Sequence, residues 1–200
     1  MDNREELTPH VLIFPFPIQG HINSMLKLAE LLCLDGIHVT FLLTDHSHGL
    51  LLRHSNVQSH FSSYSGFRFE TISDGLPDDY KRSGNNNVVE LLICLGETAK
   101  PLLKDLLMRS KGENHSNSGG GDNNPITCVI ADGIQSFALE VAEEIGIPVI
   151  YFRTSSGCNF WASFCIPELI EAGELPFQGT INYYYYYSIS VWGFFGILGY

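Results

Sequence analysis

The chain has 200 residues, which is enough for one full-sized domain with a buried core. Its hydrophobic share of 44% and charged share of 16% are typical of a globular protein and exclude a disordered one. The formal net charge of -11 argues against a protein that binds nucleic acid or an anionic membrane through its overall electrostatic field.

Two features favour a cytoplasmic protein. The five cysteines form no CxxC pair and lie mostly inside apolar runs, so we predict buried free thiols in a reducing compartment. The first ten residues, MDNREELTPH, are polar and acidic, whereas a signal peptide needs a basic start and an apolar stretch.

The first part of the chain predicts one βαβ unit. The apolar run His10–Phe16 is rich in β-formers and indicates a buried parallel strand, which ends at a sharp break, Pro17–Gly20. A helical period follows over Ile22–Asp35, and Gly36 ends it. His38–Thr44 then predicts the next strand, and such units pack right-handed into parallel sheets.

The middle of the chain is less regular. Leu50–His54 has helical character, Phe67–Ile72 alternates like a strand, and Asp74–Pro77 is typical of a turn. Val88–Ser110 predicts a helix that Pro101 weakens. The stretch from 111 to 125 is rich in Gly, Asn and Ser, which predicts a flexible surface loop within the domain.

A second βαβ-like pattern closes the domain. Thr127–Ala131 predicts a buried strand, Ser136–Ile145 an amphipathic helix, and Ile147–Phe152 a further strand. Repeated alternation of strands and helices predicts an α/β fold, a Rossmann-like doubly wound parallel sheet.

The stretch from 181 to 200 differs in character from the rest. It contains five consecutive tyrosines, carries no charge and follows neither a strand nor a helix period. We therefore predict one domain over residues 1–180 and an aberrant tail over residues 181–200 that packs poorly.

Three polar residues follow predicted strands at their carboxyl ends: His21, Asp132 and Thr154. Ligands of open parallel sheets bind at this edge. A helix N-terminus disfavours a charged imidazole, and a carboxylate on the other ring nitrogen would fix its tautomer and stabilise the cation formed in a reaction. We therefore predict that His21 and Asp132 form a base–carboxylate pair within about 2.6–3.2 Å.

Each of these residues has a plainer interpretation when taken alone. His21 can be an ordinary first-turn helix residue, and Asp132 can be a helix N-cap. Their joint placement favours a functional pair. Other sites find no support, because the sequence has no GxGxxG motif, no P-loop, and no third ligand at metal-binding spacing from His46 and His48. We therefore expect neither a metal nor a bound cofactor.

Several motifs, in the right order, carry a resemblance to a known family. PHVLIFPFPIQGHINSMLKLAELL closely resembles the opening of the plant family 1 UDP-glycosyltransferases, and TCVIADGIQSFALEVAEEIGIPVIYFRTSSGCNFWA resembles their second signature. SDGLPDD and IPELIEAGELPF are similar to the family as well, so the resemblance covers Pro9–Phe177. FRFETISDGLP resembles the iridoid glucosyltransferase branch, which includes the 7-deoxyloganetic acid glucosyltransferases.

The resemblance implies a GT-B fold, two Rossmann-like lobes that face each other across a cleft, of which this chain supplies the N-terminal one. By the same resemblance, His21 is the general base toward an acceptor hydroxyl and Asp132 its partner. Gly20 and Thr154 would contact the donor sugar, and Gln19 would line the acceptor side. UDP-glucose would be the co-substrate, a small plant metabolite of iridoid or terpenoid type the acceptor, and the reaction an inverting transfer without metal.

The family's second lobe, with its UDP-binding signature, has no counterpart here, so we expect this truncated chain to be inactive alone. A second hypothesis is a non-catalytic module that binds the acceptor. A third, the least favoured, is a membrane-tethered fragment: the stretch from 181 to 200 has the length a bilayer needs but lacks flanking basic residues.

Overall fold

In the computed structural model, the described residues are 8–82, 85–112 and 124–174. The chain divides after Thr154 into two compact units, and the whole sheet lies in the first. Most of the predicted loop at 111–125 and all of the predicted tail at 181–200 lie outside the described residues, so both stay predictions.

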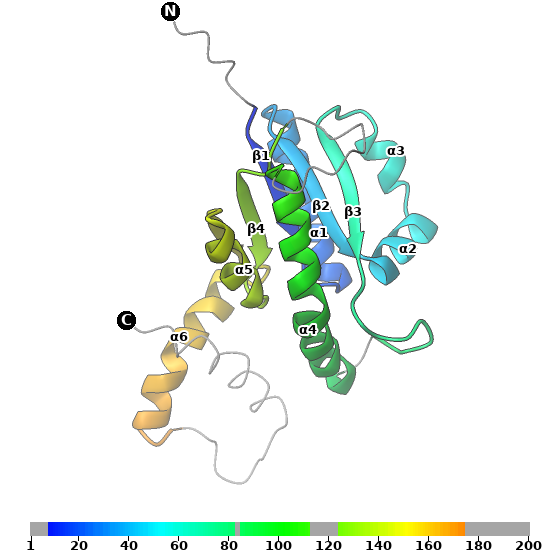
Figure 1. The fold of residues 1–200 in the computed structure, drawn as a ribbon. Helices are drawn as coiled ribbons and strands as arrows, with labels where there is room; N and C mark the ends of the chain where they lie inside the picture. Colours follow the sequence, from blue (N-terminus) through cyan, green and yellow to red (C-terminus); the bar gives the residue numbers. More distant parts are fainter. Residues whose placement is uncertain (1–7, 83–84, 113–123, 175–200) are drawn as a thin grey trace, which may run out of the picture. The chain divides into compact units, whose positions relative to one another are not determined.

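The described part of the chain contains five strands and six helices (Figure 1). In chain order they are β1 (His10–Phe14), α1 (Gln19–Leu34), β2 (His38–Thr44), α2 (Asp45–His54), α3 (Val57–Phe61), β3 (Phe67–Ile72), α4 (Asn85–Ser110), β4 (Cys128–Asp132), α5 (Phe137–Ile145), β5 (Val149–Phe152) and α6 (Gly157–Glu171).

All five strands are parallel and lie in the order β3-β2-β1-β4-β5. The order reverses direction between β1 and β4, where Phe14 pairs with Ala131. This is the topological switch point of a doubly wound sheet, so the predicted α/β fold class is confirmed.

Apolar side chains of the central strands pack into two separate hydrophobic cores, one on each face of the sheet. Along β1, Leu12 and Phe14 pack with α4 and α5, while Val11 and Ile13 face the opposite way, toward α1 and α3. Figure 1 shows α4 and α1 on opposite faces of the sheet. Because both faces are covered, the strands read as continuous apolar runs rather than as alternating ones.

The helix boundaries depart most from the sequence predictions. α1 begins at Gln19, three residues before the predicted start, because the carbonyl of Ile18 accepts from the N–H groups of both His21 and Ile22. That first turn has no apolar period that could reveal it. The sequence also predicted neither α3 nor α6, and α6 lies in the second unit.

The cysteines confirm one expectation and correct another. All five are free thiols, but none is fully buried, and Cys158 is exposed. Burial raises the pKa of the half-buried Cys33 and Cys128. Among the described helices, none is both long and apolar enough to cross a membrane.

Five described glycines adopt a left-handed backbone, and two of them, Gly146 and Gly75, lie in different surroundings. Gly146, with φ at 73°, ends α5 and has open space where a Cβ would lie. Gly75, with φ at 80°, would place a Cβ 2.3 Å from Oγ1 of Thr98.

We expect Gly146→Ala to lower the free energy of unfolding by about 1–2 kcal/mol, the cost of the backbone alone. Gly75→Ala should cost more in urea unfolding, because it adds a steric clash; equal losses would contradict this.

Candidate active site

The turn between β1 and α1 presents His21 at the carboxyl edge of the sheet. Because α1 begins at Gln19, His21 lies in the first helical turn, directly after the break at Pro17. The ring of buried Phe16 meets the imidazole edge-on, with centroids 5.7 Å apart, and limits the rotation of the ring. The side chain of His21 stays 27% exposed, so a ligand can reach it.

The predicted approach of His21 and Asp132 is confirmed. Nδ1 of His21 lies 2.6 Å from Oδ2 of Asp132, the last residue of β4. The carboxylate is almost fully buried and also accepts from the N–H groups of Phe16 at 3.4 Å and Ile134 at 3.3 Å. Asp132 therefore holds the imidazole and the turn that carries it.

Thr154 joins the same nitrogen. Its Oγ1 lies 2.9 Å from Nδ1 of His21. An ionised carboxylate oxygen 2.6 Å away can only accept, so in the neutral imidazole the proton lies on Nδ1, and the Thr154 hydroxyl then accepts a share of that proton. Two groups follow as free for a ligand: the Thr154 hydroxyl hydrogen and the lone pair of Nε2 of His21, which has no hydrogen-bond partner among the described residues.

A half-buried cation lies beside this group. Nη1 of Arg153 donates to the carbonyl of Gly133 at 3.0 Å. The arginine side chain covers Gly133 so closely that a Cβ there would lie 2.2 Å from Cδ of Arg153. Burial lowers the pKa of Arg153, and the charge of Asp132 opposes that shift.

Two positioning contacts escaped the sequence analysis. Nε2 of Gln135, which is fully buried, donates to the carbonyl of Pro15 at 3.2 Å. The hydroxyl of Ser47, at the start of α2, donates to the carbonyl of Pro17 at 3.4 Å. Both tie the turn before His21 to neighbouring segments of the sheet edge. No sequence signal marks them, because each joins an ordinary polar residue to a backbone carbonyl far away along the chain.

The remaining two candidates, Gln19 and Gly20, begin the helix that carries His21. Gly20 is exposed, and a Cβ there would meet no atom within 4 Å. Gln19 lines a cavity of about 480 Å³ between α1 and α2, together with Ile22, Ser47 and Leu50. His21, Asp132 and Thr154 do not line that cavity.

No three histidine, cysteine or acidic side chains converge as a metal site among the described residues. The cluster itself offers a proton acceptor, a buried balancing carboxylate and a hydroxyl donor. This set can deprotonate a hydroxyl group that approaches Nε2 of His21.

At the level of sequence, comparison with known proteins finds relatives of one kind, plant glucosyltransferases and glycosyltransferases. The chain matches none of the protein-family models compared with it. It is 52% identical over 174 residues to a 7-deoxyloganetic acid glucosyltransferase of Catharanthus roseus, covering 87% of this chain and 35% of the relative. It is 40% identical over 174 residues to UDP-glycosyltransferase 85A5 of Arabidopsis thaliana, covering 85% of this chain and 34% of the relative. The chain thus spans about a third of the length of these relatives.

Solved structures agree on the fold. The chain superposes on a UDP-glucose: anthocyanidin 3-O-glucosyltransferase in complex with UDP with a TM-score of 0.63 at 24% identity, covering 88% of this chain and 36% of that one. Os79 from O. sativa in complex with UDP gives a TM-score of 0.57 at 26% identity, with coverages of 82% and 32%. Fold, curated relatives and solved neighbours all lead to one assignment: this chain is homologous to the N-terminal third of the plant UDP-glycosyltransferases.

Proposed function

We propose that this chain supplies the base-bearing, acceptor-side lobe of a UDP-glucosyltransferase. The reaction is the inverting transfer of glucose from UDP-glucose to a hydroxyl or carboxyl group of a small plant metabolite of iridoid or terpenoid type. The observation that carries the proposal is the His21–Asp132 pair, at 2.6 Å, with the lone pair of Nε2 left free at the switch point of the sheet. The 52% identity to the Catharanthus roseus relative supports the acceptor class.

The geometry supports a direct displacement. Nε2 of His21 takes the proton from the acceptor hydroxyl, and the oxygen attacks the anomeric carbon of glucose. The bond from that carbon to the diphosphate oxygen breaks, UDP leaves with the bonding electron pair, and the configuration inverts. Asp132, already bonded to Nδ1, stabilises the imidazolium that forms. The proton on Nε2 then returns to solvent.

Three further residues are given roles in the proposal. The Thr154 hydroxyl hydrogen, which His21 does not need, is offered to a hydroxyl of the donor glucose. Gly20 leaves room for the sugar, and the open space where its Cβ would lie means that no protein contact requires a glycine there. Gln19 lines the acceptor side through its cavity between α1 and α2.

The proposed reaction uses UDP-glucose as co-substrate and needs no metal or cofactor, because the base and its carboxylate supply the proton transfer. We keep the cytoplasm as the proposed location, supported by the five free thiols.

The decisive experiment measures turnover. The 200-residue chain is assayed alone, and as a fusion in which the remainder of the Catharanthus roseus relative follows residue 174, with UDP-glucose and either 7-deoxyloganetic acid or (R)-mandelonitrile. We expect glucoside formation by the fusion. Binding of the acceptor without turnover in either form would instead favour a non-catalytic acceptor-binding module.

In that fusion, His21→Ala should lower turnover by at least ~10²-fold, because it removes the proton acceptor while its partners remain in place. The matched control is His60→Ala, which removes an exposed histidine whose side chain bonds to Glu30 within the described part of the chain. Unchanged turnover in a His21→Ala variant that unfolds at the same temperature as the unaltered fusion would show that His21 is not the base and would contradict the proposed mechanism.

Asp132→Asn tests the balancing charge separately from the base. The amide keeps the shape of the side chain but cannot neutralise an imidazolium, so we expect turnover to fall by roughly 10²-fold or more. The ring nitrogen signals of His21 in NMR spectra should also lose the pure Nδ1–H pattern. Asp105→Asn, which alters an exposed carboxylate paired with Arg109 on α4, is the control and should change neither measurement.

A further inference from the structure

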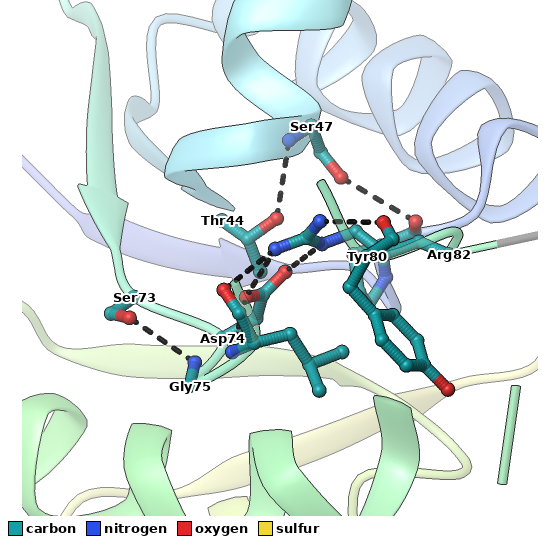
Figure 2. Close-up of polar contacts among 9 residues, drawn as sticks. Thr44, Ser47, Ser73, Asp74, Gly75, Tyr80 and Arg82 are labelled. Atoms are coloured by element: carbon teal, nitrogen blue, oxygen red, sulfur yellow. Dashed lines mark hydrogen bonds and ion pairs between the residues drawn. The ribbon is translucent and has the colours of Figure 1, made fainter. Parts of the chain in front are cut away.

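A buried ion pair lies in the loop that follows β3. Nε and Nη2 of Arg82 donate to the two carboxylate oxygens of Asp74, at 2.7 and 3.1 Å (Figure 2). The two side chains are only 7% and 4% exposed. We call this pair the loop lock, and the segment that it closes is Ser73–Arg82.

The loop lock also gathers the backbone of its own loop. Arg82 donates to the carbonyl of Tyr80 through Nη1 and to that of Leu76 through Nη2, both at 2.9 Å. Asp74 in turn accepts from the N–H of Leu76 at 3.1 Å. Figure 2 shows the guanidinium surrounded by these groups, which leaves the loop one arrangement that satisfies all of them.

The pair stays ionised near neutral pH. Burial by itself would raise the pKa of Asp74, but the hydrogen bonds from Arg82 and from the N–H of Leu76 outweigh burial and hold it below the ordinary value of 3.8. The hydrogen bond to Asp74 raises the pKa of Arg82. Charge on both partners therefore persists at neutral pH.

The tip of the loop is fixed to α4 as well. The Tyr80 hydroxyl donates to the carboxylate of Glu90, and Leu76 packs against the core beneath α4. Gly75 closes the turn in a left-handed backbone, with its N–H donating to the hydroxyl of Ser73. The loop is therefore held at its stem, its turn and its tip.

The position of this loop connects it to the candidate active site. β3 ends at Ile72, so the loop starts at the same carboxyl edge that carries His21. The charge of Arg82 lowers the pKa of His46, in the first turn of α2, after the effect of burial. Ser47 of that turn, which Figure 2 labels, donates through its hydroxyl to the carbonyl of Pro17, four residues before His21. The loop and His21 therefore follow strands that end at the same edge of the sheet, with the loop on the side of β2 and β3 and Asp132 on the other side of β1.

A buried ion pair is a poor source of stability, because two charges lose their hydration, but it can specify one conformation. Here the pair specifies the shape of a loop at the carboxyl edge of the sheet, where ligands of such sheets bind. We propose that the loop lock of Asp74 and Arg82 holds Ser73–Arg82 as a preformed wall for the acceptor, which makes Arg82 a positioning residue for acceptor binding. This inference rests on the proposed function.

The experiment compares the affinity of the 200-residue chain for 7-deoxyloganetic acid, measured by calorimetry, with that of three variants: Asp74→Asn, Arg82→Gln and the double variant. Each single variant should weaken binding by roughly tenfold or more, because the wall loses its single arrangement. The double variant should lose no more than either single one, since the two residues act as one lock. The ring NMR signals of His21 should stay unchanged, which a general loss of structure would not allow.

Two further variants keep the test sharp. Lys104→Gln breaks an exposed ion pair between α4 and α5 and should leave acceptor binding unchanged. Tyr80→Phe removes the contact between the loop and Glu90 without leaving a buried charge unpaired. This variant should therefore fold, and we expect it to bind the acceptor more weakly, so it tests the inference even if the lock variants fail to fold. Affinities within about twofold of the unaltered chain in Tyr80→Phe and in every folded lock variant would overturn the inference alone. Failure of the proposed function itself is seen without any lock variant. If the unaltered chain binds no acceptor and its fusion transfers no glucose, both the proposed function and this inference fail.

Discussion

The candidate site depends on the parallel pairing of β1 with β4. His21 and Asp132 are 111 residues apart in the chain, and only this pairing brings them within 2.6 Å. The register sets Phe14 beside Ala131, so the two strands end level and their next residues meet at one edge. A shift of register by one residue would reverse which side chains enter each core, so the two apolar faces keep the His21–Asp132 geometry in place.

The polar residues that the fold buries are concentrated at this same edge. Of the seven buried polar or charged side chains in the described residues, five lie at or just after the carboxyl ends of strands, namely Thr44, Ser47, Asp74, Asp132 and Gln135. Burying such groups costs free energy unless each finds a partner. Their bonds fix the turn before His21, the start of α2 and the loop after β3, which are the segments a ligand at the switch point would meet.

Sequence reasoning could reach the sheet and the His21–Asp132 pair for one reason: both follow from general rules. Apolar runs such as His38–Thr44 give buried strands, and the carboxyl-edge rule brings together residues that follow different strands. The start of α1 could not be predicted, because backbone hydrogen bonds to Ile18 set it without a capping side chain. Gln135 and the Asp74–Arg82 pair were missed because their meaning lies in which carbonyls and charges surround them in three dimensions.

The proposed base and the proposed acceptor wall are held by different means, and this difference has a physical reason. His21 lies in the first turn of α1 and is hydrogen-bonded to Asp132 at the end of β4, so the position of its ring follows from the packed core. The Ser73–Arg82 loop has no regular secondary structure, and it is held instead by the Asp74–Arg82 network, the contact of Tyr80 with Glu90 and the core packing of Leu76. The proposed base, the imidazole of His21, can be fixed by the core of the fold because its position does not have to change from one acceptor molecule to another. A surface that must match one acceptor rather than another can change in such a loop without disturbing that core, since loops tolerate substitution better than the elements they connect.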